Sequence, residues 1–173
     1  MCTANQCRSP MGEALLQRRL QERGVDAVVS SAGLLPGGAP ATEPAIEAMA
    51  AEGLDISGHL SRQVTTELIH EADLVVAMAR QHLIEVTLMA PAAWPRMFQA
   101  VDLVRRGEEV GRRPEDQPFA DWLAAVGAGR TRSAILAASL SDDVADPVGQ
   151  PAAVYNRTKV LLDDLLTRLA GLV

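Results

Sequence analysis

The chain has 173 residues, of which 48% are hydrophobic and 22% charged, a composition typical of one folded domain over 1–173 rather than of a disordered or fibrous protein. The net charge of −6 and the 3% of aromatic residues argue against a nucleic-acid partner, because such proteins usually carry a basic surface or aromatic side chains for base stacking. No apolar run approaches the roughly 18 residues of a membrane span, and the polar first residues are unlike a signal peptide, so we expect a cytoplasmic protein with no membrane association.

The first half of the chain alternates β-like runs with amphipathic helical stretches, which predicts an α/β fold with a parallel sheet. Ser9-Pro10 is typical of a helix start, and the apolar spacing that follows predicts a helix ending near Gly24. We then expect a buried strand over 25–31, helices over 42–53 and 65–71, and a second strand over 73–78.

The second half predicts a helix over 80–89, a Gly/Pro-rich stretch over 107–118, further helix to about residue 140, and a long amphipathic helix after Pro151. The predicted fold class is a three-layer α/β domain with a parallel four-stranded sheet flanked by helices. In such sheets a buried strand normally feeds the loop that opens a helix. Only Met1 precedes Cys2, so we expect the first strand to be missing or truncated.

The segment from Cys2 to Pro10 carries the strongest functional signal, because a cysteine is followed six positions later by an arginine and then by a helix-opening Ser-Pro. Such a loop can turn successive backbone N–H groups inward to bind a tetrahedral oxyanion, which the helix dipole also favours. Arg8 supplies a planar fork for two phosphoryl oxygens, and the same field favours the thiolate form of Cys2. The predicted phosphate-binding residues are Thr3, Ala4, Asn5, Gln6, Cys7, Arg8 and Ser9.

This segment resembles the phosphate-binding loop of the low-molecular-weight protein-tyrosine phosphatase family, whose pattern is Cys-x-x-Asn-x-Cys-Arg-Ser-Pro. The family places its general acid in an Asp-Pro pair before the last helix, where this chain has Asp146-Pro147. Segments 31–33 and 55–63 are also similar to family segments. The resemblance implies a phosphomonoester hydrolase, with a phosphotyrosine protein as the expected substrate.

The resemblance also implies a mechanism and a set of roles. Cys2 attacks phosphorus to form a cysteinyl-phosphate, Arg8 and the backbone stabilise the equatorial oxygens, and Asp146 protonates the leaving oxygen and then activates water. Asn5 would hold the loop and Ser9 would donate to the thiolate. This chemistry requires no metal and no organic cofactor. Cys7 remains open between packing, a protective disulfide with Cys2 and an attacking thiol.

Other ionisable residues have weaker claims to the site. Asp142 and Asp143 compete with Asp146 as acids, but only Asp146 precedes a proline, which favours an extended backbone there. We interpret His59 as structural, hydrogen-bonded to backbone, because the mechanism leaves it no role. His70 and His82 fall in helical stretches with no partner pattern.

The chain departs from phosphotyrosine-specific relatives at the walls of the cleft. Residues 34–38 and 148–150 carry no aromatic side chain, so the extra stacking energy of a ring pair is absent. Two alternative functions follow: an arsenate reductase that uses an external small thiol, since no cysteine follows Cys7, and a non-catalytic phosphate-binding protein, since the first strand is missing. The sequence determines neither the substrate nor the oligomeric state.

Overall fold

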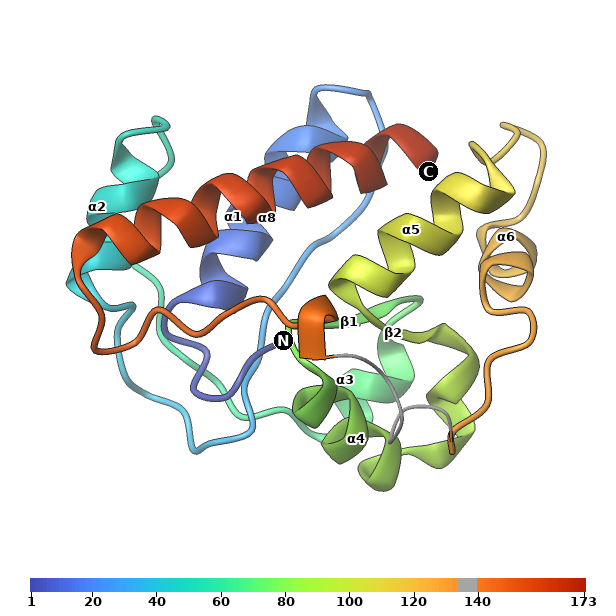
Figure 1. Ribbon diagram of the computed structural model, residues 1–173, viewed down its shortest axis with the longest axis horizontal. Coiled ribbons are helices and arrows are strands. Elements are labelled where there is room, and N and C mark those ends of the chain that lie inside the picture. Colours follow the sequence, from blue (N-terminus) through green and yellow to red (C-terminus); the bar gives the residue numbers. More distant parts are fainter. Residues whose placement is uncertain (134–139) are drawn as a thin grey trace.

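The structure is a computed structural model that describes residues 1–133 and 140–173. Helices and two short strands follow one another along the chain (Figure 1). Their bounds are α1 Arg8–Gln21, α2 Glu43–Ala50, α3 Thr66–Glu71, β1 Val75–Ala77, α4 Arg80–Met89, the 3₁₀ helix η1 Pro91–Arg96, β2 Met97–Gln99, α5 Ala100–Val110, α6 Phe119–Val126, the 3₁₀ helix η2 Leu140–Asp142 and α8 Ala152–Leu172. Within these described residues no helix is both long and apolar enough to cross a membrane.

Most predicted helices lie where their start and stop signals put them. The first ends at Gln21 and is closed by Gly24 with a φ of 69°, a backbone conformation that glycine adopts without strain. Thr65 caps α3 by accepting a hydrogen bond from the Leu68 N–H, and α4 has the predicted bounds. The final helix follows Pro151 as expected. Helix was predicted as far as about residue 140, but α6 ends at Val126 and residues 127–133 are turns and irregular backbone; the part of the prediction over 134–139 lies outside the described residues.

The sheet differs from the prediction, because the described residues contain two strands rather than four. β1 and β2 pair in parallel, with Val75 opposite Met97 and Ala77 opposite Gln99. Parallel pairing requires a crossover, which α4 and η1 supply between the two strands. Near the N-terminus the strand pairing is reduced to isolated parallel bridges, Cys2 with Gly33 and Gly33 with Gln63.

The predicted strand over 25–31 is the clearest error. This segment has no regular secondary structure, and Val28 is 95% exposed rather than buried. It borders an apolar cavity of about 800 Å³ that is also lined by Met1 and by Val75 and Val76 of β1. A strand needs a neighbour to complete its hydrogen bonds. Segment 25–31 faces a cavity where that neighbour would lie, so it stays irregular.

Helices cover both faces of the two strands. Helix α8 runs along one side of the molecule across α1, α2 and α5, while α4 packs on the other side of β1 and β2 (Figure 1). One hydrophobic cluster lies beneath α8 and includes Met11, Phe98 and Leu162, and a second lies beside α4 and includes Ile69 and Val86. The fold is therefore α/β with helices on both faces of a small parallel sheet.

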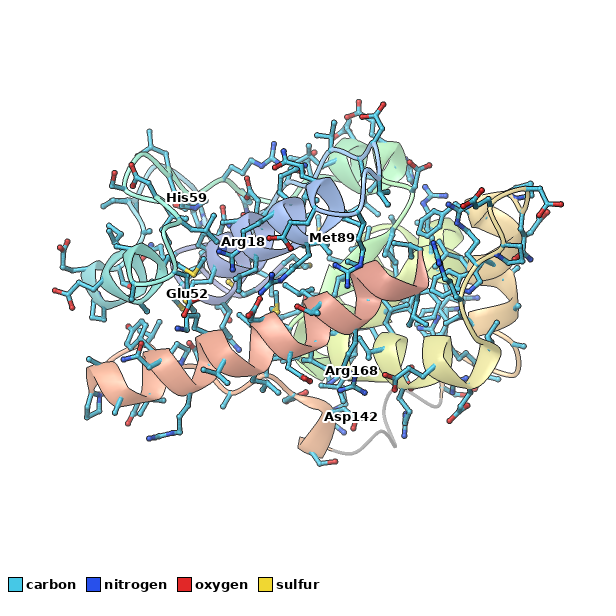
Figure 2. The ribbon with its side chains drawn as sticks, turned by 90° about the horizontal axis from the view of Figure 1, so that it is seen from above. Arg18, Glu52, His59, Met89, Asp142 and Arg168 are labelled. Carbon is cyan, nitrogen blue, oxygen red and sulfur yellow. The ribbon has the colours of Figure 1, made fainter. Side chains whose placement is uncertain are left out.

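Polar contacts tie α8 to the helices at its N-terminal end. Lys159 forms an ion pair with Glu52, and Arg18 of α1 donates from Nη1 to the Glu52 carbonyl oxygen at 2.9 Å. Figure 2, which looks onto α8 from above, shows Arg18 and Glu52 on the neighbouring elements. These contacts fix α1, and with it the loop that precedes α1, against the long helix.

Candidate active site

The first residues of the loop that leads into α1 are held by backbone hydrogen bonds. The Cys2 N–H donates to the Ala32 carbonyl at 3.3 Å, and the Leu34 N–H donates to the Thr3 carbonyl at 2.7 Å. Gly33 permits this close approach, since a Cβ there would lie 2.7 Å from both the Asn5 nitrogen and the Thr3 oxygen. Any side chain at position 33 would therefore displace the loop.

The predicted nucleophile lies at the bottom of this loop. Cys2 is 1% exposed, and its Sγ is 3.0 Å from the Ser9 hydroxyl in the first turn of α1. The helix dipole at this N-terminus and the hydroxyl together favour a negative charge on the sulfur. The sequence prediction that Ser9 donates to Cys2 is compatible with this distance.

Asn5 connects the loop to three other segments of the chain. Its Nδ2 donates to the Ser9 hydroxyl at 2.9 Å and to the Ser31 hydroxyl at 2.7 Å, and its Oδ1 accepts from the Arg62 N–H at 2.9 Å. Its φ is 56°, the only positive value among the described residues other than glycine. The Nε2 of His59 lies 2.7 Å from the Asn5 carbonyl, which is the structural contact expected for this histidine.

Arg8 and Asp146, which are far apart in the sequence, meet beside the loop. The Nη2 of Arg8 donates to Asp146 Oδ2 at 2.6 Å, and Nη1 donates to the Val144 carbonyl at 3.0 Å. The Arg8 side chain is buried, while the Asp146 side chain is 44% exposed and open to a ligand. The structure thus places Asp146 on Arg8, whose neighbour Ser9 contacts the Cys2 sulfur; that these residues are catalytic stays a prediction.

Cys7, the second cysteine, is a free buried thiol. Its Sγ lies 3.8 Å from Asp146 Oδ1. Burial, followed by the nearby charge of Cys2, raises the pKa of Cys7 to about 12, so the side chain is protonated at neutral pH. A protonated thiol is a weak attacking group, and in this arrangement Cys7 packs beside the acid rather than competing with Cys2.

His82 belongs to the site although its sequence context gave no signal. Its Nε2 lies 2.9 Å from the Thr3 hydroxyl, across 79 positions of sequence, and the side chain is 3% exposed. Burial, assisted by the positive charge of Arg8, lowers the pKa of His82 to about 4 and keeps the ring neutral. A contact between such distant positions has no local pattern, so sequence reasoning could not find it.

A small cavity of about 260 Å³ opens beside the ion pair of Arg8 and Asp146. Its wall includes Thr3, His82 and Asp143. Leu35 and Val148 belong to the two segments, 34–38 and 148–150, that carry no aromatic side chain. They are about half exposed, at 50% and 51%. The approach to the site is therefore lined by aliphatic and polar groups.

The two competing carboxylates have other partners. Asp142 lies 3.6 Å from Arg105 of α5, and Asp143 accepts hydrogen bonds from the Arg80 N–H and from Gln99. The ion pair with Arg8 is instead made by Asp146. This placement favours Asp146 for chemistry that involves the guanidinium.

The chain is similar in sequence to a family of phosphatases and to named members of it. The profile of the family described as "Low molecular weight phosphotyrosine protein phosphatase" matches residues 1–109. A probable low molecular weight protein-tyrosine-phosphatase, EpsP of Ralstonia solanacearum, is 33% identical over 129 residues, which are 75% of this chain and 87% of that protein. The protein-arginine-phosphatase of Bacillus subtilis is 29% identical over 98% of this chain and 91% of its own length.

Solved structures give the same result for the fold. The low molecular weight protein tyrosine phosphatase from T. tengcongensis superposes with a TM-score of 0.71 at 30% identity, covering 97% of this chain and 92% of that one. The likeness therefore extends over nearly the whole chain, beyond the segment that carries the loop.

Proposed function

The chain belongs to the low molecular weight phosphotyrosine protein phosphatase family, and on this premise we propose that it hydrolyses phosphomonoesters through a cysteinyl-phosphate on Cys2. The observation that carries the proposal is the convergence of the Cys2 sulfur, the Ser9 hydroxyl, the Arg8 guanidinium and the Asp146 carboxylate at the N-terminus of one helix. These groups are the nucleophile, its stabiliser, the phosphate clamp and the acid that phosphoryl transfer to sulfur needs.

In the first step the Cys2 thiolate attacks phosphorus in line with the leaving oxygen. The S–P bond forms while the P–O bond to the leaving group breaks, and a proton on Asp146 passes to that oxygen. The backbone N–H groups of the loop and the dipole of α1 stabilise the equatorial oxygens.

Arg8 must exchange partners during this step. Without substrate its Nη2 is paired with Asp146 at 2.6 Å. A phosphoryl dianion carries more charge than a carboxylate and accepts a bidentate fork, so it takes over the guanidinium. Asp146, released from the guanidinium, is then free to face the leaving oxygen and can serve as the acid.

In the second step Asp146, now ionised, removes a proton from water. The water oxygen bonds to phosphorus, the S–P bond breaks, and inorganic phosphate and the Cys2 thiolate are released. The Ser9 hydroxyl, 3.0 Å from the sulfur, stabilises that thiolate as a leaving group. The same carboxyl group thus works as acid and then as base.

The substrate we propose is a phosphorylated protein of the cytoplasm. The named relatives are protein phosphatases for tyrosine or arginine. A phosphotyrosine ring can pack against Leu35 and Val148, but these side chains offer no ring stacking. The aliphatic stem of a phosphoarginine side chain suits the same walls, so this phosphoramidate is the second candidate. With it the P–N bond breaks in the first step, and Asp146 protonates the leaving nitrogen instead of an oxygen.

The test is a hydrolysis assay with phosphotyrosine and phosphoarginine peptides, with Cys2→Ser as the blank. We expect turnover of at least one peptide by the wild type and a loss of at least about 10⁴-fold in Cys2→Ser, as for other removed nucleophiles. Trapping of a phosphorylated protein during turnover, absent in Cys2→Ala, which has no side-chain atom to accept the phosphoryl group, identifies the intermediate.

Three other outcomes contradict the proposal. Arsenate-dependent oxidation of glutathione without hydrolysis of any phosphate ester would assign the site to arsenate reduction. Binding of inorganic phosphate with no turnover of either kind would assign it to a phosphate-binding protein. Equal hydrolysis by wild type and Cys2→Ser would remove Cys2 from the chemistry.

A further inference from the structure

The segment that carries Asp146 is anchored only a few residues before the acid. Oδ1 of Asp143 accepts two hydrogen bonds of 2.7 Å, one from the Arg80 N–H and one from the Nε2 of Gln99. The Val144 N–H donates to the Met78 carbonyl at 2.8 Å. Two consecutive residues are thus tied to the segments that follow β1 and end β2.

These anchor points are rigid. Gln99 is the last residue of β2 and is 3% exposed, and Met78 directly follows β1 and is 4% exposed. Arg80 is the first residue of α4, whose N-cap Ala79 has no side chain to bond the helix N–H groups. The Asp143 carboxylate supplies that cap from another part of the chain, where the helix dipole favours its charge.

Beyond Val144 the segment is held by fewer contacts: Pro147 is buried, and the Val148 N–H donates to Asp146 Oδ1 at 3.2 Å within the segment itself. Val144 is 0% exposed, whereas Ala145, Asp146 and residues 148–150 are exposed. The Asp146 side chain itself contacts Arg8, the partner that the proposed reaction takes away. When Arg8 turns to phosphate, the position of Asp146 depends on the backbone fixed at Asp143 and Val144.

We infer that Asp143 is a positioning residue for the general acid, a clamp that ties the Asp146 segment to Gln99 of β2 and to the first turn of α4. The inference rests on the proposed function, in which Asp146 protonates the leaving group. Proton transfer requires the carboxyl group within about 3 Å of the leaving oxygen, and a misplacement of about 1 Å can cost about 100-fold. Loss of the clamp therefore weakens proton donation while the nucleophile and the phosphate nest stay intact.

The leaving group distinguishes this role from a general structural one. Phenolate, with a conjugate-acid pKa near about 10, needs the proton, whereas 2,4-dinitrophenolate leaves readily without it. We expect Asp143→Ala to lower kcat/KM, which reports only the steps up to release of the leaving group, by about 10- to 30-fold for phenyl phosphate and by less than about 3-fold for 2,4-dinitrophenyl phosphate. Asp146→Asn should show the same selectivity more strongly.

Two further variants test the geometry. Asp143→Asn keeps an oxygen acceptor without the charge, so we expect it to recover part of the loss, and Gln99→Met removes one of the two donors at similar volume. Asp142→Asn is the matched control, because Asp142 is the adjacent carboxylate but lies 3.6 Å from Arg105 of α5. Figure 2 labels Asp142. This control should leave both esters unchanged.

The outcomes separate the two proposals. Equal losses on both esters in Asp143→Ala and Asp143→Asn, or no loss on either, contradict the clamp while leaving the phosphatase assignment intact. A wild type that hydrolyses neither ester contradicts the proposed function itself, and the clamp with it. Circular dichroism and the melting temperature of each variant establish that it is folded.

Discussion

The catalytic edge, by which we mean the loop from Cys2 to Arg8 and the Asp146 segment, differs in packing from the sheet region behind it. At the edge, the loop from Cys2 to Arg8 is bonded to Ser9, Ser31 and the Asp146 segment by hydrogen bonds of 2.6 to 3.0 Å. Directly behind it, segment 25–31 and β1 border a cavity of about 800 Å³. Met1 lies between the two regions and donates from its amino group to the Val76 carbonyl.

The difference teaches that the site is organised by local polar contacts rather than by an extended sheet. Interiors normally pack densely, and unfilled apolar volume lowers stability. The polar contacts around Cys2 are made by Asn5 and Ser9, whereas the cavity behind is lined largely by apolar side chains. Changes in the cavity should act mainly on stability, and changes at the edge mainly on activity.

Filling the cavity is expected to have the largest effect. An extension of five apolar residues joined to Met1 would continue the bonding of Met1 along β1, because Met1 already accepts from the Met78 N–H and donates to Val76. Buried apolar side chains and paired backbone groups should raise the free energy of unfolding by about 3 kcal/mol, or Tm by about 10 °C. Thermal unfolding monitored by circular dichroism measures the shift.

A polar extension of equal length, rich in glycine, serine and aspartate, is the control. It cannot bury side chains in the apolar cavity, so Tm should stay within about 2 °C of the starting chain. Hydrogen exchange of segment 25–31 and of β1 should slow with the apolar extension alone. Equal Tm values for the two extensions would show that an apolar segment does not pair with β1 and fill the cavity.

Breaking the edge gives the next largest effect. Asn5→Ala removes the bonds to Ser9, Ser31 and the Arg62 N–H and places alanine at a φ of 56°, so we expect kcat/KM on an aryl phosphate to fall by about 100-fold. Asn5→Gly loses the same bonds but adopts this φ freely, so its loss should be smaller. Equal activity of Asn5→Ala and wild type would contradict the importance of this network.

The sequence predicted the parts of both regions that depend on local patterns. The spacing from Cys2 to Arg8 and the proline after Asp146 pointed to residues that the structure brings together. Most helix bounds were correct within about three residues because caps and glycine stops are local signals. The family resemblance supplied the position of the acid.

Features that depend on distant partners could not be predicted. The strand over 25–31 fails because strand formation needs a neighbour, and β2 was missed because three residues after a proline-containing 3₁₀ helix show no alternation. Helix α5 was missed where Gly107 suggested a break, but Gly107 packs closely against Trp122 inside the helix. His82 and Asp143 bond to residues dozens of positions away, which no local pattern encodes.

The pH dependence of stability that we expect from His82 is the smallest of the three effects. It tests how tightly the protein packs where the two regions meet. His82 is held neutral by burial and by Arg8, with the amino group of Met1, Asp146 and Asp143 also facing it, and its pKa falls from 6.5 to about 4. Between these values the unfolded chain binds the proton and the folded chain does not, so stability is fully present above pH 6.5 and declines toward pH 4. From pH 7.5 to 5 this residue should cost about 2 kcal/mol.

His82→Gln isolates that contribution, because glutamine offers an Nε2 to the Thr3 hydroxyl but does not titrate. The difference in unfolding free energy between wild type and His82→Gln should shift by about 2 kcal/mol from pH 7.5 to 5, measured by urea unfolding. His70→Gln, at an exposed histidine of α3, should show no such shift. Burial lowers the pKa of the Met1 amino group to about 6 as well, but that group is common to all three chains and cancels in the difference. A pH-independent difference for His82→Gln would mean that water reaches the imidazole, and that the loose packing of the cavity extends to the catalytic edge.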